Sequence, residues 1–341
     1  MVLARSPQMS SLNAKTDVVR WGVIGAGGIA DVVVPDIGTT PGNQVLAVAA
    51  RDPERAAAFA ARHGITRSYG SYDALLADPD VDVVYIATTH AQHHGQALAA
   101  LRAGKPVLVE KAFTLNARQA REVVAEARAR QLFCMEGMWM RLHPMVREAA
   151  GLAAEGRIGK ITGVRADLSR LFPYDPAHRL YDLALGGGAL LDLGVYPATF
   201  AWLILGRPDT VQAVGSLAPT GSDLTVAMQW GYAGGQVAQI FCSAAGPSPY
   251  TGLITGTEGW IRLEERIHRA SAITVHTQGE ERVIAAPETI GGGFGHEIAE
   301  VARCLREGLP ESPLVPLDET VAILEVLDEA RAQLGVRYEV D

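Results

Sequence analysis

The sequence contains few cysteines and no cluster of basic residues. The three cysteines, Cys134, Cys242 and Cys304, lie far apart and show no metal-ligand spacing. Disulfide-stabilised secreted domains are shorter and richer in cysteine, so we expect reduced, buried thiols in a cytoplasmic protein. The formal net charge is -8 and no Lys/Arg run occurs, which argues against nucleic acid as a partner because phosphate-binding surfaces need clustered cations.

Signal-peptide and membrane-span features are also missing. Residues 1–17 lack a continuous apolar core and a twin-arginine pair. No later stretch reaches the roughly 18 apolar residues that a transmembrane helix needs, so we expect no membrane partner. The 341 residues, 48% hydrophobic and 20% charged, suit a folded chain of two domains.

The first half of the chain alternates short apolar runs with alanine-rich helical segments. Uninterrupted apolar runs such as Val18–Ile24 and Val83–Ala87 are typical of buried strands. Helices begin at Asp52-Pro53 and at Asn116, where an N-cap residue is in place. Strands separated by helices predict βαβ crossovers, and hence an N-terminal Rossmann domain with a doubly wound parallel sheet over residues 18–140. Residues 1–17 are then an N-terminal extension.

The pattern changes after about residue 140. From Thr210 onward, strand-like segments follow one another with short glycine-containing breaks, which is typical of antiparallel pairing. Helices are expected over 189–205, 294–306 and 317–334. The second half therefore predicts an α+β domain over residues 141–341, with a large, mostly antiparallel open sheet covered by helices. The short junction predicts a cleft shared by both domains.

A glycine-rich turn follows the first strand directly and precedes a helix. Its residues include Gly25, Gly27, Gly28 and Ile29. Glycines allow a tight turn and a close approach of pyrophosphate, while the helix N-terminus supplies N–H donors and a positive dipole. The pattern alone is weak, but its place as the first turn of a βαβ chain predicts dinucleotide binding.

The end of the second strand bears on the choice of dinucleotide. NAD-selective domains usually have an acidic residue there, whereas this chain has Arg51 followed by Asp52. Arg51 can pair with a 2′-phosphate, and Asp52 is explained as a helix cap. NADP is therefore preferred over NAD.

Two further segments carry candidate catalytic groups. Glu110 and Lys111 end a parallel strand, at the edge of the sheet where ligands bind. Asp192 and Tyr196 are four residues apart after a run of glycines, and so share a helix face. Tyr196 is a proton donor and acceptor if the Lys111 ammonium lowers its pKa, and Asp192 would orient the substrate or Lys111. Each of these residues taken singly is also explained as ordinary surface or core.

At these positions the chain resembles the Gfo/Idh/MocA oxidoreductase family, over nearly all of residues 18–341. The shared segments are Ile86–His90 with His93, Val109–Lys111 and Gly187–Pro197. The resemblance is strongest to its branch of dimeric dihydrodiol dehydrogenases and NADP-dependent D-xylose dehydrogenases.

The resemblance implies an NAD(P)-dependent dehydrogenase or reductase acting on CH–OH groups of a sugar, polyol or cyclic diol. It implies catalysis by Lys111, Asp192 and Tyr196, and a homodimer or homotetramer formed through the C-terminal sheet. The cofactor contacts that we expect beyond the glycine turn are Arg51, Thr88, His90, His93, Glu110, Lys111, Trp139 and Arg141.

One position departs from the family pattern. The family generally has proline after Glu-Lys, where this chain has Ala112. An X–Ala bond strongly prefers trans, so the sequence predicts a trans bond after Lys111 and a changed placement of that lysine.

Three other points stay open in the sequence. A metal site at His90, His93 and His94 is disfavoured because no Cys or acid stands nearby, so no metal is expected. His178, Arg179 and Asp182 suit a substrate pocket or a polar loop equally well. Alternatives on the same fold are a keto-sugar reductase of deoxysugar biosynthesis and a noncatalytic dinucleotide-sensing regulator. The regulator would be expected to lack the catalytic residues present here.

Overall fold

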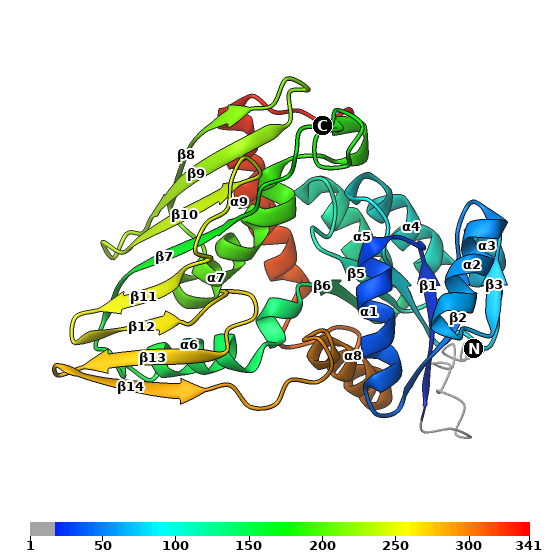
Figure 1. Ribbon diagram of the computed structural model, residues 1–341, viewed down its shortest axis with the longest axis horizontal. Coiled ribbons are helices and arrows are strands. Elements are labelled where there is room, and N and C mark those ends of the chain that lie inside the picture. Colours follow the sequence, from blue (N-terminus) through cyan, green and yellow to red (C-terminus); the bar gives the residue numbers. More distant parts are fainter. Residues whose placement is uncertain (1–17) are drawn as a thin grey trace, which may run out of the picture.

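Two β-sheets, each built from a different half of the chain, organise the protein (Figure 1). This computed structural model describes residues 18–341. The predicted extension, residues 1–17, lies outside the described residues. Helices pack against both sheets, and the two sheets with their helices stand side by side (Figure 1).

The first sheet is parallel, with strand order β3-β2-β1-β4-β5-β6. This is the doubly wound order of a Rossmann domain, as predicted. Its strands are β1 (Val19–Ile24), β2 (Asn43–Ala49), β3 (Arg67–Tyr69), β4 (Val83–Ile86), β5 (Val107–Glu110) and β6 (Cys134–Gly137). Its helices are α1 (Gly28–Thr39), α2 (Pro53–His63), α3 (Tyr72–Leu76), α4 (His90–Arg102) and α5 (Ala117–Arg130).

Local sequence explains where several of these helices begin and end. The Asp52 side chain accepts hydrogen bonds from two backbone N–H groups of α2, and Gly64 ends that helix with φ 65°. Asn116 caps α5 by accepting from the backbone N–H of Gln119. Both caps are confirmed predictions, because each satisfies N–H groups that have no partner inside the helix.

The second sheet has the order β14-β13-β12-β11-β7-β10-β9-β8. Neighbouring strands are antiparallel except β7 and β10, which confirms the predicted mostly antiparallel sheet. The strands are β7 (Ile161–Ser169), β8 (Thr210–Leu217), β9 (Asp223–Gly231), β10 (Val237–Ser243), β11 (Gly252–Gly256), β12 (Gly259–Leu263), β13 (Ala272–Thr277) and β14 (Glu280–Ala285).

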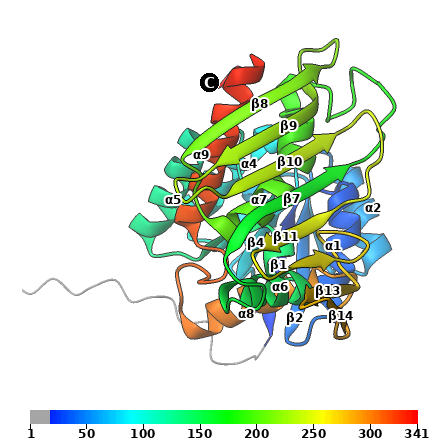
Figure 2. The ribbon, with the colours of Figure 1, turned by 90° about the vertical axis from the view of Figure 1, so that its left-hand side faces the viewer.

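Helices cover one face of this sheet and leave the other uncovered (Figure 2). The covering helices are α6 (Pro144–Ala154), η3 (Leu190–Gly194), α7 (Val195–Leu205) and α9 (Leu317–Leu334). The helix α8 (Gly295–Glu307) packs against α1 and against the short helix η1 (Trp139–Leu142), and the short helix η2 (Leu183–Leu185) contacts α4. The predicted domain boundary between residues 140 and 141 falls inside η1. The helix α9 contacts β8 of the second sheet as well as α5 and β6 of the first domain, so it connects the two.

Two strands and two α-helices were missed by sequence reasoning, as were the short helices η1 and η2. The strands β3 and β14 are mostly half-buried or exposed, so neither has the apolar run that indicates a strand. The helices α3 and α6 were also overlooked, although Ser71 and His143 cap them.

One apolar helical stretch requires a correction. Within residues 18–341, Leu183–Leu205 is long and apolar enough to cross a membrane by length and composition, whereas the sequence analysis expected no such stretch. However, 83% of its most apolar window is buried inside the protein. This burial is typical of a core helix, which can be as long and as apolar as a membrane-spanning helix.

Candidate active site

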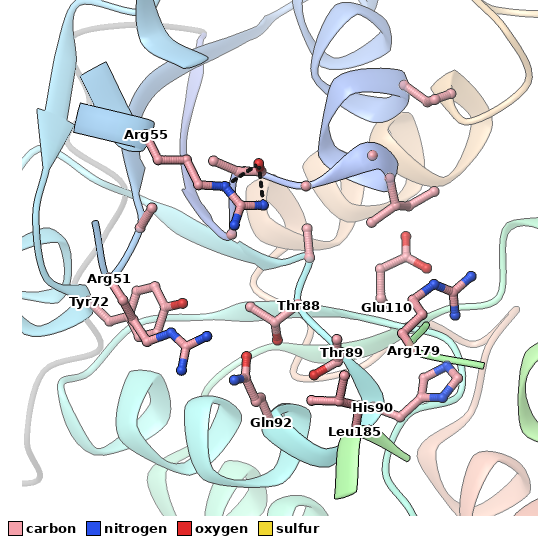
Figure 3. Close-up of a pocket in the computed structure, with 18 of the residues that line it drawn as sticks. Arg51, Arg55, Tyr72, Thr88, Thr89, His90, Gln92, Glu110, Arg179 and Leu185 are labelled. Atoms are coloured by element: carbon pink, nitrogen blue, oxygen red, sulfur yellow. Dashed lines mark hydrogen bonds between the residues drawn. The ribbon is translucent and has the colours of Figure 1, made fainter. Parts of the chain in front are cut away.

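A cavity of about 840 Å³ lies at the edge of the first sheet where its strands end, and reaches toward the second domain (Figure 3). This volume is in the range of cofactor and substrate pockets. Its lining comes from the loops after β1, β2, β4 and β5, and from the segment before α7. Its lining includes Gly25, Gly27, Gly28, Arg51, Arg55, Tyr72, Thr88, His90, Glu110, Lys111, Arg179 and Asp192.

The glycine turn forms one wall of this cavity. Gly25 has φ 108°, and an added Cβ would lie 2.6 Å from the carbonyl oxygen of Ala87, so only glycine fits. Gly27 is the N-cap of α1 and makes no side-chain cap, which leaves the first N–H groups of the helix available. An added Cβ on Gly28 would meet nothing within 4 Å. The turn therefore fits a pyrophosphate, as the sequence predicts.

Two arginines and a tyrosine line the end of the cavity beside β2 (Figure 3). Arg51 is exposed, and Arg55 donates from Nε and Nη2 to the carbonyl oxygen of Ala26 at 3.2 and 3.0 Å. Tyr72, the first residue of α3, lines the same end. Because the Asp52 carboxylate is engaged in capping α2, the charged side chains that remain here are cationic.

The predicted catalytic lysine and aspartate meet across the two domains. Lys111 Nζ donates to Asp192 Oδ1 at 3.0 Å and to the Asp192 backbone oxygen at 2.9 Å. Arg179 binds the same carboxylate through both guanidinium nitrogens, at 3.0 and 3.1 Å. These two cations hold the pKa of Asp192 well below its usual range despite burial, so Asp192 is a carboxylate with two positive partners.

Tyr196 lies beside this ion pair. Lys111 Nζ is 5.2 Å from the centre of the Tyr196 ring, and the hydroxyl of Tyr196 accepts a hydrogen bond from Trp139 Nε1 at 3.0 Å. The helix that carries Asp192 and Tyr196 begins with a π-helical turn, η3, before α7. Such wider turns are frequent at functional sites. The structure thus brings Lys111, Asp192 and Tyr196 together.

Burial changes the acid–base balance of this group. It raises the pKa of Tyr196 to about 12, although Lys111 and the Trp139 hydrogen bond act in the opposite direction. Lys111 lowers the pKa of Tyr196, as expected, but the loss of hydration on burial outweighs this charge, so the net pKa lies above that of a free tyrosine. The pKa of Lys111 is raised by Asp192 against the effect of its burial, so Lys111 stays an ammonium.

The bond between Lys111 and Ala112 is cis, which corrects the trans bond predicted from the sequence. Hydrogen bonds to buried partners hold the backbone on both sides of it. The Ala112 oxygen accepts from His93 Nδ1 at 2.9 Å, and the Phe113 N–H donates to Glu136 Oε1 at 3.2 Å. Tertiary contacts rather than the local preference therefore set the backbone that carries Lys111.

The remaining expected cofactor contacts divide into two groups. Thr88, His90 and Glu110 line the cavity; His90 Nδ1 donates to the Gly186 oxygen at 3.0 Å, and Glu110 accepts from the Tyr85 hydroxyl at 2.6 Å. His93, Trp139 and Arg141 do not line it. They are buried behind its walls.

His93 and Arg141 have structural partners instead. The ring nitrogens of His93 lie against the backbone oxygens of Ala112 and Thr88. Arg141 points to the start of α9, where it binds the oxygen of Leu314 before the helix and the side chain of Glu319 in its first turn. Neither residue is placed to touch a ligand in the cavity, which corrects both expectations. A sequence pattern does not reveal which way a buried polar side chain points.

Of the predicted substrate residues, only Arg179 lines the cavity. His178 Nδ1 accepts from the Leu180 N–H at 3.3 Å, and Asp182 caps η2. In residues 18–341 no group of three or more His, Cys, Asp or Glu side chains is arranged to hold a metal ion.

Three residues near the site were not predicted from the sequence: Arg55 and Tyr72 at the nucleotide end, and His268 beside Tyr196. Arg55 could have been predicted, because it lies four residues after Arg51, in the first turn of α2. No sequence signal marks Tyr72 or His268, because each enters the site through a tertiary contact.

Comparison with known proteins agrees with this geometry. Residues 19–138 match the family model described as "Oxidoreductase family, NAD-binding Rossmann fold", and residues 146–262 match "GFO/IDH/MocA C-terminal domain". The chain belongs to the Gfo/Idh/MocA family of oxidoreductases. This confirms the resemblance found in its sequence.

Relatives match over nearly the whole chain. The chain is similar to trans-1,2-dihydrobenzene-1,2-diol dehydrogenase from Bos taurus, with 38% identity over 95% of this chain and 99% of the relative. Its Homo sapiens counterpart is 36% identical over the same shares. Among solved structures it is similar to KijD10, a 3-ketoreductase from Actinomadura kijaniata in complex with NADP and TDP-benzene, with TM-score 0.83, 28% identity, and coverage of 93% and 98%.

A more distant structure shares the fold. The aldose-aldose oxidoreductase from Caulobacter crescentus complexed with glycerol has TM-score 0.85 and 22% identity, over 93% of this chain and 98% of that one. The predicted pairing of a Rossmann domain with a large, mostly antiparallel sheet is therefore confirmed as the fold of this protein.

Proposed function

We propose that this protein is an NADP-dependent dehydrogenase or reductase that acts on a secondary hydroxyl group, or the matching ketone, of a sugar, polyol or cyclic diol. The observation that carries the proposal is the meeting of Lys111, from the first domain, with Asp192 and Tyr196 of the second, beside the cavity. The names of the relatives, diol dehydrogenases and a ketoreductase, support the same class of substrate.

Each residue has a separate task in this reaction. When bound, a nicotinamide dinucleotide supplies the hydride acceptor or donor. Tyr196, protonated at neutral pH, donates its phenolic proton to the substrate oxygen during reduction, and its phenolate form accepts the proton of the substrate hydroxyl during oxidation. Lys111 stabilises negative charge on that oxygen or on the phenolate. Asp192 holds the Lys111 ammonium in place and keeps it charged.

We propose NADP as the preferred dinucleotide because of the charges at the nucleotide end. Arg51 and Arg55 both line this end of the cavity, and guanidinium groups suit a 2′-phosphate. An NAD-selective site needs a carboxylate that is available for the ribose hydroxyls. Asp52, the acid nearest to Arg51, is already occupied by the N–H groups of α2.

The experiment pairs two variants that test different parts of the site. Tyr196→Phe should lower kcat by about 100-fold while leaving the Kd for NADP nearly unchanged. Arg51→Ala should weaken NADP binding much more than NAD binding, measured by titration of protein fluorescence. Full turnover in the first variant would remove Tyr196 from the reaction. Equal losses for both dinucleotides in the second would contradict the phosphate contact.

We also propose that two copies of the chain associate through the uncovered face of the second sheet (Figure 2). Val214 on β8 is 70% exposed and Phe241 on β10 is 39% exposed, and apolar side chains on a sheet face favour burial against a partner. Light scattering should give the mass of a dimer or tetramer for the native chain. It should give a lower mass for Phe241→Arg, and a native chain that is monomeric would contradict the proposal.

A further inference from the structure

A buried carboxylate of the second sheet holds the start of the helix that carries Asp192 and Tyr196. Asp223, the first residue of β9, is 1% exposed, and its Oδ2 accepts a hydrogen bond from the Leu190 N–H at 2.5 Å. Leu190 is the first residue of η3, two positions before Asp192 and six before Tyr196. An anion at the start of a helix is stabilised by the helix dipole and by a charge-assisted hydrogen bond.

The surroundings of Asp223 suit its ionised form and not its protonated form. Its Oδ1 is buried and has no hydrogen-bond partner among residues 18–341. The Gly188 backbone, with φ 142°, packs so closely that an added Cβ would lie 2.2 Å from this oxygen. A proton on Oδ1 would therefore have no acceptor, and a proton on Oδ2 would face the Leu190 N–H, donor against donor. Because a buried donor without an acceptor is costly, protonation favours a shift of the turn that begins the helix.

Two other side chains hold the glycine turn before this helix. The Gly186 oxygen accepts from His90 Nδ1 at 3.0 Å, and the Gly187 oxygen accepts from the Tyr338 hydroxyl at 3.0 Å. Burial lowers the pKa of His90 to about 3 and raises the pKa of Tyr338 above its usual range. Neither therefore changes charge between pH 5 and pH 8. Burial raises the pKa of Asp223 to about 6, so of these three partners only Asp223 titrates in that range.

The other groups that face Asp223 keep their charge over the same range. Arg331 on α9 and Cys242 on β10 interact with it electrostatically. Against the effect of its burial, a hydrogen bond to Asp341 raises the pKa of Arg331, which stays a cation. Burial raises the pKa of the Cys242 thiol, which stays neutral. On the helix itself, the pKa of Asp192 lies well below its usual range because of its cationic partners, despite burial, so Asp192 stays ionised.

We propose that Asp223 is a positioning residue: its carboxylate form fixes the start of the η3–α7 helix and so holds Asp192 and Tyr196 opposite Lys111, whereas its protonated form releases this helix start and lowers turnover. The inference rests on the proposed function, since the turnover concerned is that assigned to Tyr196. Asp223 does not line the cavity, so it acts through the helix alone. The glycine turn that fits the dinucleotide belongs to the other domain, and NADP binding should therefore not depend on Asp223.

The test is the pH dependence of 2-hydroxycyclohexanone reduction by NADPH between pH 5 and pH 8. In this direction Tyr196 donates a proton and stays protonated throughout, so its own titration does not contribute. At pH 5 about one tenth of the Asp223 carboxyl is ionised, so kcat of the native protein should be about tenfold lower than at pH 8. Asp223→Asn cannot ionise. Its kcat should be independent of pH and about tenfold or more below the native value at pH 8, with an unchanged Kd for NADP.

A second aspartate of the same domain provides the matched control. Asp209 also accepts a backbone N–H, that of Ala233 at 2.6 Å, but its side chain is exposed. Asp209→Asn should keep both the native kcat and its fall at acid pH. A fall at acid pH that persists in folded Asp223→Asn would overturn the proposal, and so would equal losses of kcat and of NADP affinity.

A second readout needs only the native protein with bound NADP. Because Trp139 Nε1 donates to the Tyr196 hydroxyl, the ¹H–¹⁵N signal of this indole reports the position of that hydroxyl. The signal should shift with a midpoint near pH 6, and should not shift in Asp223→Asn where that variant folds. A native signal that stays constant between pH 5 and pH 8 would contradict the role of Asp223. A signal that shifts in a protein that reduces neither this ketone nor a keto-sugar would instead count against the proposed oxidoreductase function.

Discussion

The hydrogen bond from Trp139 to Tyr196 offers a sharp test of how the tyrosine is tuned. The indole Nε1 donates to the phenolic oxygen at 3.0 Å, and both side chains are buried. Trp139→Phe keeps an aromatic ring against Phe294 and removes this donor. A hydrogen bond to a charged oxygen is worth about 1 kcal/mol more than one to a neutral oxygen. Its loss should therefore raise the pKa of Tyr196 by roughly 0.7 units.

The assay is the pH dependence of alcohol oxidation at saturating NADP. Oxidation requires Tyr196 to accept a proton, so its rate should rise with pH toward the high pKa of this residue. In Trp139→Phe the rising limb should shift to higher pH, and kcat on that limb should be about fivefold lower at a given pH. The profile should shift to higher pH because the phenolate of Tyr196 loses a stabilising hydrogen bond, and its pKa therefore rises.

A matched control comes from another tryptophan. Trp230 on β9 is fully buried, and its Nε1 has no partner in the part of the chain that the structure describes. Trp230→Phe removes the same chemical group without breaking a hydrogen bond, so the pH profile should stay that of the native protein. An unshifted profile in Trp139→Phe, or an equal shift in both variants, would refute the reasoning.

Two further predictions concern stability. Burial raises the pKa of the Glu136 carboxyl group to about 7 in the folded protein, whereas its pKa in the unfolded chain is near 4.5. The contribution of this group to the free energy of unfolding is therefore fully present below pH 4.5 and is lost as the pH rises through 7. Glu136→Gln should therefore gain about 2 kcal/mol relative to the native protein between pH 5 and pH 8, measured by urea unfolding; a pH-independent difference would contradict this. Asp36→Ala leaves the N–H groups of Gly292 and Phe294 without their acceptor and should cost about 2–4 kcal/mol. Asp31→Ala, at an exposed ion pair of the same helix, should cost less than about 1 kcal/mol.

Much of the fold could be predicted because the relevant signals are local. The apolar runs of the parallel strands, the caps at Asp52 and Asn116, and the glycine turn each identify an element by a few adjacent residues. The elements that were missed have weaker local signals. Only three residues form β3, and Arg67–Tyr69 are half-buried or exposed, so no hydrophobic pattern distinguishes this strand from a loop.

The residues that form the site could be predicted from the sequence, but the directions of their side chains could not. Lys111 and Asp192 are 81 positions apart, and residue type with position in the βαβ pattern was enough to select both. The direction of a buried polar side chain depends on distant partners. Arg141 was expected at the cofactor because of its place in the chain, but it binds the segment before α9. The cis bond after Lys111 is likewise set by contacts with His93 and Glu136 rather than by the alanine that follows.

The charges at the centre of the site explain why the lysine rather than the arginine is suited to assist the reaction. Asp192 has two cationic partners, Lys111 and Arg179, and both are close enough to its carboxylate to form ion pairs. The Lys111 side chain is 13% exposed and that of Arg179 is 44% exposed. Water screens the exposed guanidinium, whereas the buried ammonium acts through a medium of lower polarity. The positive charge that acts on Tyr196 is therefore mainly that of Lys111, which lies over the Tyr196 ring, where negative charge develops as the proton leaves.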